Sequence, residues 1–231
     1  MRSLRQARPV TDAAAGSHAD PYHLGRGEEG FGESSASGRG TGGPSSKRIV
    51  VGYGMWIFLL GDIITFSCFF AAYAVLVNAT AGGPSGRDLF DLTNVAIQTG
   101  CLLLSSFTCG MASLALAARR KLAFHAAMLV TFLLGATFLL LEIREFAELV
   151  ERGAGPGRSA FLSAFFTLVG CHGLHISVGL LWLLTTMAQV FAKGFRPDMT
   201  RRFLCFSLFW HALDIVWVAL FTVVYLMGSI A

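Results

Sequence analysis

The chain has 231 residues, of which 54% are hydrophobic and only 14% are charged, and its formal net charge is +4 at pH 7. Soluble domains carry about 25% charged residues, so this composition excludes an ordinary soluble protein and indicates an integral membrane protein. The 26 glycines agree with a helical membrane bundle, because glycine lets membrane helices approach closely. All five cysteines lie in apolar segments without a CxxC motif, so we expect no disulfide framework.

The first 46 residues differ in composition from the rest of the chain. They are rich in Gly, Ser and Pro with scattered charge, and they contain no apolar core. Such a segment cannot bury enough surface to offset its ordering entropy. It also lacks the apolar stretch of a secretory signal. We therefore expect a disordered N-terminal tail over residues 1–46 and a transmembrane domain over residues 47–231.

Five apolar segments follow the tail, and each is long enough for one crossing, which needs about 20 residues. Each must be helical, because hydrocarbon cannot satisfy open backbone groups. The fourth segment is longer than a crossing requires, so we expect it to tilt or to extend past the interface. The predicted fold is an all-α integral membrane bundle of five transmembrane helices over residues 49–77, 94–118, 122–150, 159–192 and 203–230.

The distribution of cations predicts the orientation of the bundle. Nine Lys and Arg residues lie in the N-terminal flank and in the second and fourth connections, and three lie on the opposite side. Cytoplasmic loops of membrane proteins carry an excess of Lys and Arg. The N-terminus is therefore predicted to be cytoplasmic and the C-terminus periplasmic, and five crossings agree with that parity.

Histidines and carboxyl groups occur at membrane depth in three of the segments. His172 and His175 are three residues apart and share one helix face, as do His211 and Asp214, and Asp62 is the only charge in the first segment. A rise of about 1.5 Å per residue places all of them except His175 in the inner half of the bilayer, roughly 10–20 Å from its cytoplasmic face. Polar groups at that depth are costly and face protein, water or a partner.

Several interpretations of these groups remain open. They can be polar contacts that fix helix packing, members of a proton relay, or ligands of a metal or haem. The last would make the chain a stand-alone membrane metalloenzyme, or a transporter, using His172, His175, His211 and Asp214. The ligand set is sparse for such a role, since the chain has only six histidines and no CxxCH, P-loop or dinucleotide motif. Asp62 can take its hydrogen-bonding partner from His172, His211 or Asp214, which lie at the same estimated depth.

A second group of charged residues lies at the end of the third segment. Glu142 and Glu145 are the deepest of this group, and we expect them near the outer interface, where they can contact a partner helix. The charges that follow them have the four-residue spacing of ion pairs on a solvated helix end.

Four motifs in these segments resemble a known family. They are Met55–Asp62, Glu142-x-x-Glu145-Phe146, Gly170-Cys-His-Gly-Leu-His175 followed by Gly179, and Phe209–Trp217. Together they resemble subunit III of haem–copper terminal oxidases. Asn78–Pro84, Ser105–Ala112 and Tyr225–Gly228 resemble the ubiquinol oxidase branch of that family. The resemblance covers about residues 48–231 and leaves the tail outside.

The resemblance implies a non-catalytic, accessory subunit of a proton-pumping oxidase in the bacterial cytoplasmic membrane. Such a subunit packs on subunit I, which holds the haem and copper, and shares the complex with subunits II and IV. It carries no metal or haem of its own, binds phospholipid, supports proton uptake and makes the enzyme more durable. The partners it implies are protein subunits and membrane lipid, with no nucleic acid. The complex is expected to be a quinol:O₂ oxidoreductase or a cytochrome c oxidase.

Overall fold

The computed structural model describes residues 47–82, 91–194 and 197–230, all of which belong to the compact unit Pro44–Ala231. The expected tail over residues 1–46 lies entirely outside the described residues. The described elements are all helical: α1 (Lys47–Leu76), α3 (Leu92–Ala117), α4 (Lys121–Glu151), α5 (Ala160–Lys193), α6 (Pro197–Leu220), a π-helical segment η1 (Phe221–Leu226) and α7 (Met227–Ile230).

Five helices in the described part of the chain are long and apolar enough to cross a membrane, which confirms the predicted all-α bundle. The fifth crossing runs from Met199 to Leu226, through α6 and η1. At about 1.5 Å per residue, the 31 residues of α4 and the 34 residues of α5 exceed a hydrocarbon core of about 30 Å. The ends of both helices therefore reach past the apolar layer.

The helix boundaries differ from the predicted ones most clearly at the start of α6. This helix begins at Pro197, whereas the apolar pattern placed its start at residue 203. Proline is well suited to the first helical position because its φ angle is preset and no N–H is lost there. At the start of α3, the side chain of Asp91 accepts a hydrogen bond from the backbone N–H of Thr93 at 3.0 Å. This cap begins the helix two residues earlier than hydrophobicity alone indicates.

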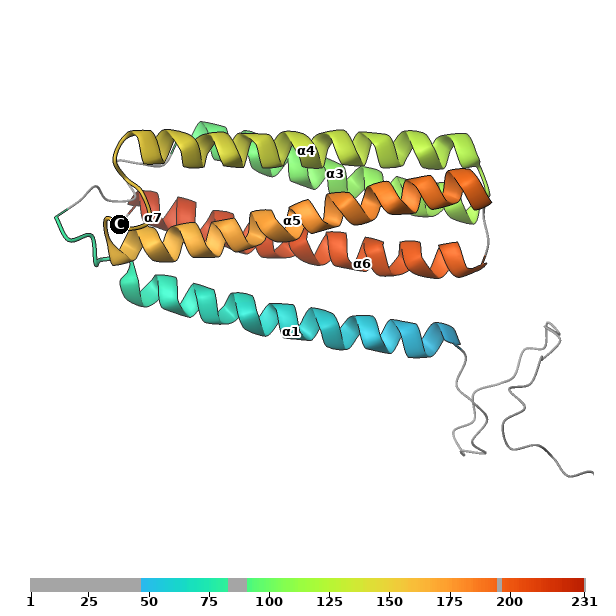
Figure 1. Ribbon diagram of the computed structural model, residues 1–231, viewed down its shortest axis with the longest axis horizontal. Coiled ribbons are helices and arrows are strands. Elements are labelled where there is room, and N and C mark those ends of the chain that lie inside the picture. The colour runs from blue at the N-terminus through green and yellow to red at the C-terminus, as the bar shows by residue number, and fades with distance from the viewer. Residues whose placement is uncertain (1–46, 83–90, 195–196, 231) are drawn as a thin grey trace, which may run out of the picture. The chain divides into compact units, whose positions relative to one another are not determined.

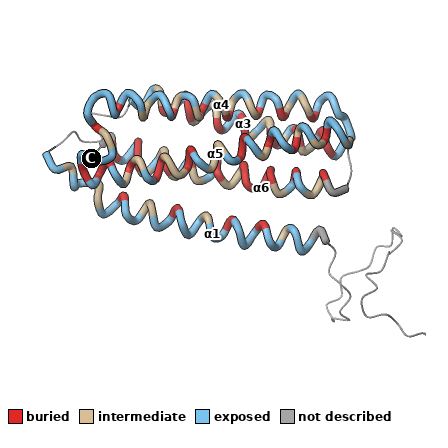
Figure 2. The backbone as a smooth tube through the Cα atoms, in the orientation of Figure 1, coloured by how far each residue is buried: buried red, intermediate tan, exposed pale blue. Residues whose placement is uncertain are grey.

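The helices pack as a four-helix group with α1 at one side (Figure 1). α3 and α4 form an antiparallel pair because their connection is a tight turn, in which Arg119 has a φ of 53°. α5 packs against α4 and α6, and α6 also packs against α3. α1 packs against α5 and α6, and most of its surface is exposed (Figure 2). The large apolar side chains exposed on these helices are what hydrocarbon would cover.

Trp210 of α6 is the side chain around which the four-helix group closes. It is 1% exposed, and its indole N–H donates to Ser105 Oγ on α3 at 3.1 Å. Its ring lies against Gly135 of α4 and Gly179 of α5, where an added Cβ would come within 2.9 Å of the ring carbons. One residue of α6 therefore contacts three other helices, and two glycines provide the space for its ring.

We predict that Gly179→Ala destabilises the bundle, because the added methyl group would clash with the indole ring of Trp210. Overpacking of this kind costs about 1–3 kcal/mol of unfolding free energy. Gly100→Ala on α3 is the matched control, since nothing lies within 4 Å of its Cβ position. Unfolding in detergent measures both variants, and equal stability of the two would contradict the packing described for Trp210.

Candidate functional site

Asp62 of α1 faces His175 of α5. The distance from Asp62 Oδ1 to His175 Nε2 is 3.8 Å, and both side chains are 23% exposed. Their separation is within the range of an ion pair and too long for a direct hydrogen bond. The depth estimate had not placed His175 among the partners of Asp62, and the structure brings these two residues together. This pair and the Tyr73–Val224 hydrogen bond are polar contacts that connect α1 to the bundle.

The hydrogen bonding of His175 fixes which of its ring nitrogens carries a proton. Its Nδ1 lies 2.7 Å from the backbone carbonyl oxygen of Cys171, which can only accept, so Nδ1 is the donor. In a neutral ring, Nε2 then faces Asp62 with a lone pair. A second proton must reside on Asp62 or on Nε2 for the contact to be attractive, because an unpaired carboxylate is costly at membrane depth.

His172 is enclosed by aromatic rings. It is fully buried, stacks on Trp217 at a centroid distance of 5.2 Å, and meets the edges of Phe66 and Phe138. Neither ring nitrogen has a hydrogen-bond partner among the described residues. These contacts bring together α1, α4, α5 and α6, so His172 lies at a junction of four helices and is shielded from any ligand outside the bundle.

His211 and Asp214 lie together on α6 at its contact with α3. Nδ1 of His211 is 2.6 Å from Ser106 Oγ of α3. Asp214 is half-buried, and its Oδ1 atom has no hydrogen-bond partner among the described residues. These residues line an open groove on the α3 side, whereas Asp62 faces α5. The polar groups that were predicted at a similar depth are thus divided between different helix contacts.

Glu142 and Glu145 of α4 point into the bundle. Glu142 is 2% exposed, and its carboxyl group lies where a side chain on Gly173 of α5 would stand. Glu145 accepts a hydrogen bond from Gln98 Nε2 of α3 at 3.0 Å. The two carboxyl groups therefore connect α4 to both of its neighbours within this chain.

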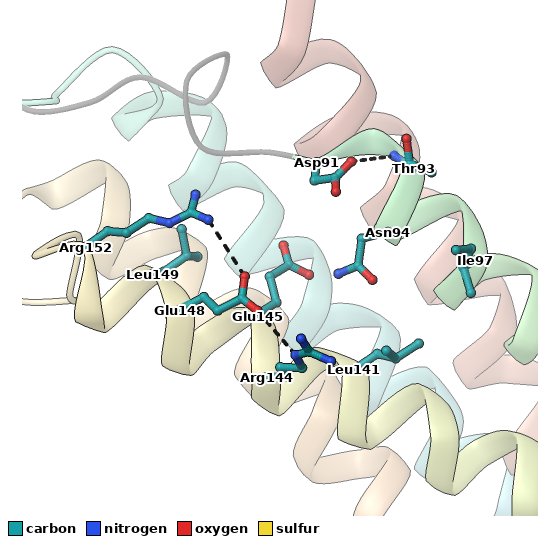
Figure 3. Close-up of a pocket in the computed structure, with 10 residues that line it drawn as sticks. All are labelled: Asp91, Thr93, Asn94, Ile97, Leu141, Arg144, Glu145, Glu148, Leu149 and Arg152. Atoms are coloured by element: carbon teal, nitrogen blue, oxygen red, sulfur yellow. Dashed lines mark hydrogen bonds and ion pairs between the residues drawn. The ribbon is translucent and has the colours of Figure 1, made fainter.

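Beside Glu145, a cavity of about 340 Å³ opens between the start of α3 and the end of α4 (Figure 3). Asp91 and Asn94 border it from the α3 side. On the α4 side, Glu148 pairs with Arg144 at 3.3 Å and with Arg152 at 3.8 Å. These two pairs are solvent-exposed, and such pairs contribute little to stability. Because charged and polar side chains of both helices line it, the cavity is a polar cleft at the end of the bundle.

Within the described residues, no group of three or more His, Cys, Asp or Glu side chains could hold a metal ion. The three histidines face different surroundings. His172 is enclosed by aromatic rings, His175 faces Asp62, and His211 faces Ser106. The four residues of a metalloenzyme site therefore do not converge on one point.

Sequence reasoning missed several neutral partners of these groups. Trp217 Nε1 donates to Thr99 at 3.0 Å, and the Tyr73 hydroxyl donates to the carbonyl oxygen of Val224 in η1 at 3.4 Å. Gln98 and Ser105 belong to the buried face of α3 together with Leu102 and Cys109. Their helical spacing could have indicated a polar face turned toward the protein.

Comparison with known proteins gives a consistent result. The family model described as Cytochrome c oxidase subunit III matches residues 34–229, so the match begins within the segment that the motifs had left outside. A Pseudomonas aeruginosa protein named Cytochrome bo(3) ubiquinol oxidase subunit 3 is 54% identical over 178 residues, 77% of this chain and 85% of that protein.

Two further relatives come from Bacillus. Quinol oxidase subunit 3 of Bacillus subtilis is 43% identical over 76% of this chain and 86% of its own length. Cytochrome c oxidase subunit 3 of Bacillus sp. strain PS3 is 44% identical over 77% of this chain and 86% of its own length. The relatives therefore include subunits of oxidases that are named for different electron donors.

We predict that Asp62→Asn preserves assembly, because an amide can still hydrogen-bond as a protonated carboxyl does. Asp62→Leu should lower the unfolding free energy by about 1–3 kcal/mol, since the Nε2 atom of His175 loses its partner. Unfolding in detergent measures this difference.

Oxygen consumption against pH by the assembled enzyme separates a structural role of Asp62 from a proton-conducting one. We expect wild type and Asp62→Asn to give the same profile. Slower sustained turnover of Asp62→Asn would instead show that the proton of the Asp62–His175 pair takes part in turnover.

Proposed function

The chain belongs to the cytochrome c oxidase subunit III family, and from this premise we propose its place within the oxidase. As a member of that family it is an accessory subunit of a terminal oxidase complex in the bacterial inner membrane. We propose that it packs on subunit I, which holds the haem and copper, in a complex with subunits II and IV. Its role there is to stabilise the complex in the membrane.

The observation that carries this proposal is that the polar groups in the membrane-spanning helices contact neighbouring helices of the same chain. Trp210, Trp217 and His211 each hydrogen-bond to a side chain of α3. Glu145 hydrogen-bonds to Gln98 of α3, and Asp62 faces His175 across the α1–α5 contact. These groups hold helices together, which is what a structural subunit requires, and they leave no convergent set for chemistry within the described residues.

We assign ubiquinol as the electron donor of the complex. The support is the 54% identity to a subunit named for ubiquinol oxidase, together with the resemblance of Asn78–Pro84, Ser105–Ala112 and Tyr225–Gly228 to the ubiquinol oxidase branch. The donor would react at other subunits, so this assignment concerns the complex and not a site in this chain.

Support of proton uptake is a second candidate function. The specific observation in its favour is that the Asp62 carboxyl group of α1 faces the His175 imidazole of α5 at 3.8 Å within the membrane-spanning part of the bundle. A group that can be protonated at that depth can gather protons for a partner subunit. The turnover measurement on Asp62→Asn distinguishes this function from stabilisation alone.

The isolated chain should bring phospholipid with it and should carry no haem and no stoichiometric metal. Exposed apolar side chains along its helices, such as Ile64, Phe107 and Leu140, support lipid contact. The pure subunit is examined by visible spectroscopy, metal analysis and phosphorus determination. A haem spectrum from the pure chain would favour the metalloenzyme alternative and contradict the accessory role.

The proposed orientation has the N-terminus in the cytoplasm and the C-terminus in the periplasm. It rests on the excess of cations at the α3–α4 turn and at the α5–α6 connection. A single cysteine at Arg120 in a cysteine-free background should react with a membrane-impermeant thiol reagent only after the inner membrane is opened. A cysteine at Gly155 should react in intact spheroplasts, and the opposite pattern would reverse the orientation.

A further inference from the structure

Two carboxyl groups lie inside the bundle, next to the polar cleft between the start of α3 and the end of α4. Glu142 and Glu145 are three residues apart on α4, so their side chains share one face of the helix. This face is turned toward the protein, because Glu142 is 2% exposed and Glu145 hydrogen-bonds to Gln98 of α3. The Glu142–Glu145 pair therefore places two acids in one enclosed region.

No cation balances this pair among the described residues. Arg144 and Arg152 lie on the same helix, but both form their ion pairs with Glu148 at the solvent-exposed end. The titratable side chains around the pair are Asp91 of α3, Glu148 of α4 and Tyr225 of η1. None of these three groups can carry a positive charge, so the surroundings add negative charge or none.

The neighbouring helix α5 offers no counterion either. It presents Gly173 to Glu142, and the carboxyl group lies where a side chain on this glycine would stand. His172 precedes Gly173, but aromatic rings enclose its imidazole, which hydrogen-bonds to neither carboxyl group. A buried carboxylate without a counterion is costly, and two carboxylates close together also repel each other. The enclosure therefore disfavours a state in which both groups are ionised.

Hydrogen bonding distinguishes the two carboxyl groups. Glu145 Oε2 accepts a hydrogen bond from Gln98 Nε2 at 3.0 Å, and the Tyr225 hydroxyl lies beside the same carboxyl group. Donors at Glu145 stabilise its ionised form. By contrast, Glu142 Oε2 and Gln98 Oε1 are both buried without a hydrogen-bond partner among the described residues. A proton on Glu142 removes its charge and turns one of its oxygens from an acceptor into a donor.

Glu145 also connects this enclosed region to water. It lines the cleft of about 340 Å³ that opens at the end of the bundle (Figure 3). A polar cleft of that size holds water molecules. On the opposite side, Tyr225 belongs to the π-helical segment η1, and π-helical turns occur frequently at functional sites. Glu142 thus has a route to the aqueous phase that passes through Glu145.

We propose that Glu142 and Glu145 form a proton-binding site, in which Glu142 carries one exchangeable proton beside the Glu145 carboxylate. Binding forms an O–H bond on the Glu142 carboxyl group with a proton taken from water in the cleft. Release breaks that bond and returns the proton to the water, and the charge of the pair changes from −1 to −2. The site lies within this chain, so the inference goes beyond the accessory role and does not depend on it.

Infrared spectroscopy of the full-length chain tests this proposal. The chain is studied in dodecyl maltoside, a detergent without ester groups, and the carbonyl band of protonated carboxylic acids is recorded against pH. Glu148→Gln is the matched control for Glu142→Gln, because it removes a half-exposed carboxyl group from the same helix. At about pH 7, where exposed carboxyl groups are ionised, wild type and Glu148→Gln should show a band of one protonated group that Glu142→Gln lacks. The band should shift in deuterium oxide.

A second variant, Glu145→Gln, retains Glu142 and removes its negatively charged neighbour. The band of Glu142 should then disappear at a pH lower by at least about one unit, as expected for two coupled carboxyl groups, whereas Glu148→Gln should not move it. Three results would overturn the proposal: a band that Glu142→Gln leaves unchanged, a band that does not shift in deuterium oxide, or a midpoint that is the same in wild type and Glu145→Gln. Each of these results would leave the accessory role intact.

Discussion

The structure depends on one constraint, which is that hydrocarbon offers no hydrogen bonds to polar groups. Polar side chains in the spanning helices are therefore more stable when they face protein than when they face lipid, and this preference determines which helix faces turn inward. Trp210 shows the result most clearly, because its indole N–H bonds to Ser105 while its ring fills the space left by Gly135 and Gly179. Polar pairing and close packing therefore occur at the same residue.

The same constraint explains how a bundle rich in histidine and carboxyl groups can have an accessory role. His172 is enclosed by aromatic rings, His175 faces Asp62 and His211 faces Ser106. Each is directed to a different helix contact, so the side chains that could have formed a ligand set are separated by packing. The half-buried Asp214 lies beside His211 and Ser106 at the α3–α6 contact, away from Asp62 and His175.

The sequence was sufficient to predict the class of the fold and much of the family assignment. Long uncharged segments allow only membrane helices, and the ordered motifs around Asp62, His172 and Asp214 predicted the family that the comparisons establish. The start of α6 at Pro197 was missed because hydrophobicity marks the part of a helix inside the bilayer, whereas the helix begins in the connection before it. The bulge of η1 was not predictable either, because no single residue type specifies it.

Partner assignments were less accessible from sequence than the positions of the polar residues. Depth along a helix can be counted, but the direction of a side chain around the bundle depends on how the helices pack. Asp62 was therefore predicted at a suitable depth while its contact with His175 was missed. Similarly, Glu142 and Glu145 were expected to meet a partner helix, and the structure directs them to α5 and α3 of the same chain.

Removing this subunit from the assembled oxidase tests its accessory role directly, when the haem spectrum and the oxygen consumption of the remaining complex are followed over time. If this chain is an accessory subunit, the haem spectrum and the initial rate of oxygen reduction should persist, while the complex should lose activity sooner and unfold at a lower temperature. Loss of a haem signal, or loss of the initial rate in a complex that is otherwise intact, would contradict the accessory role of this chain.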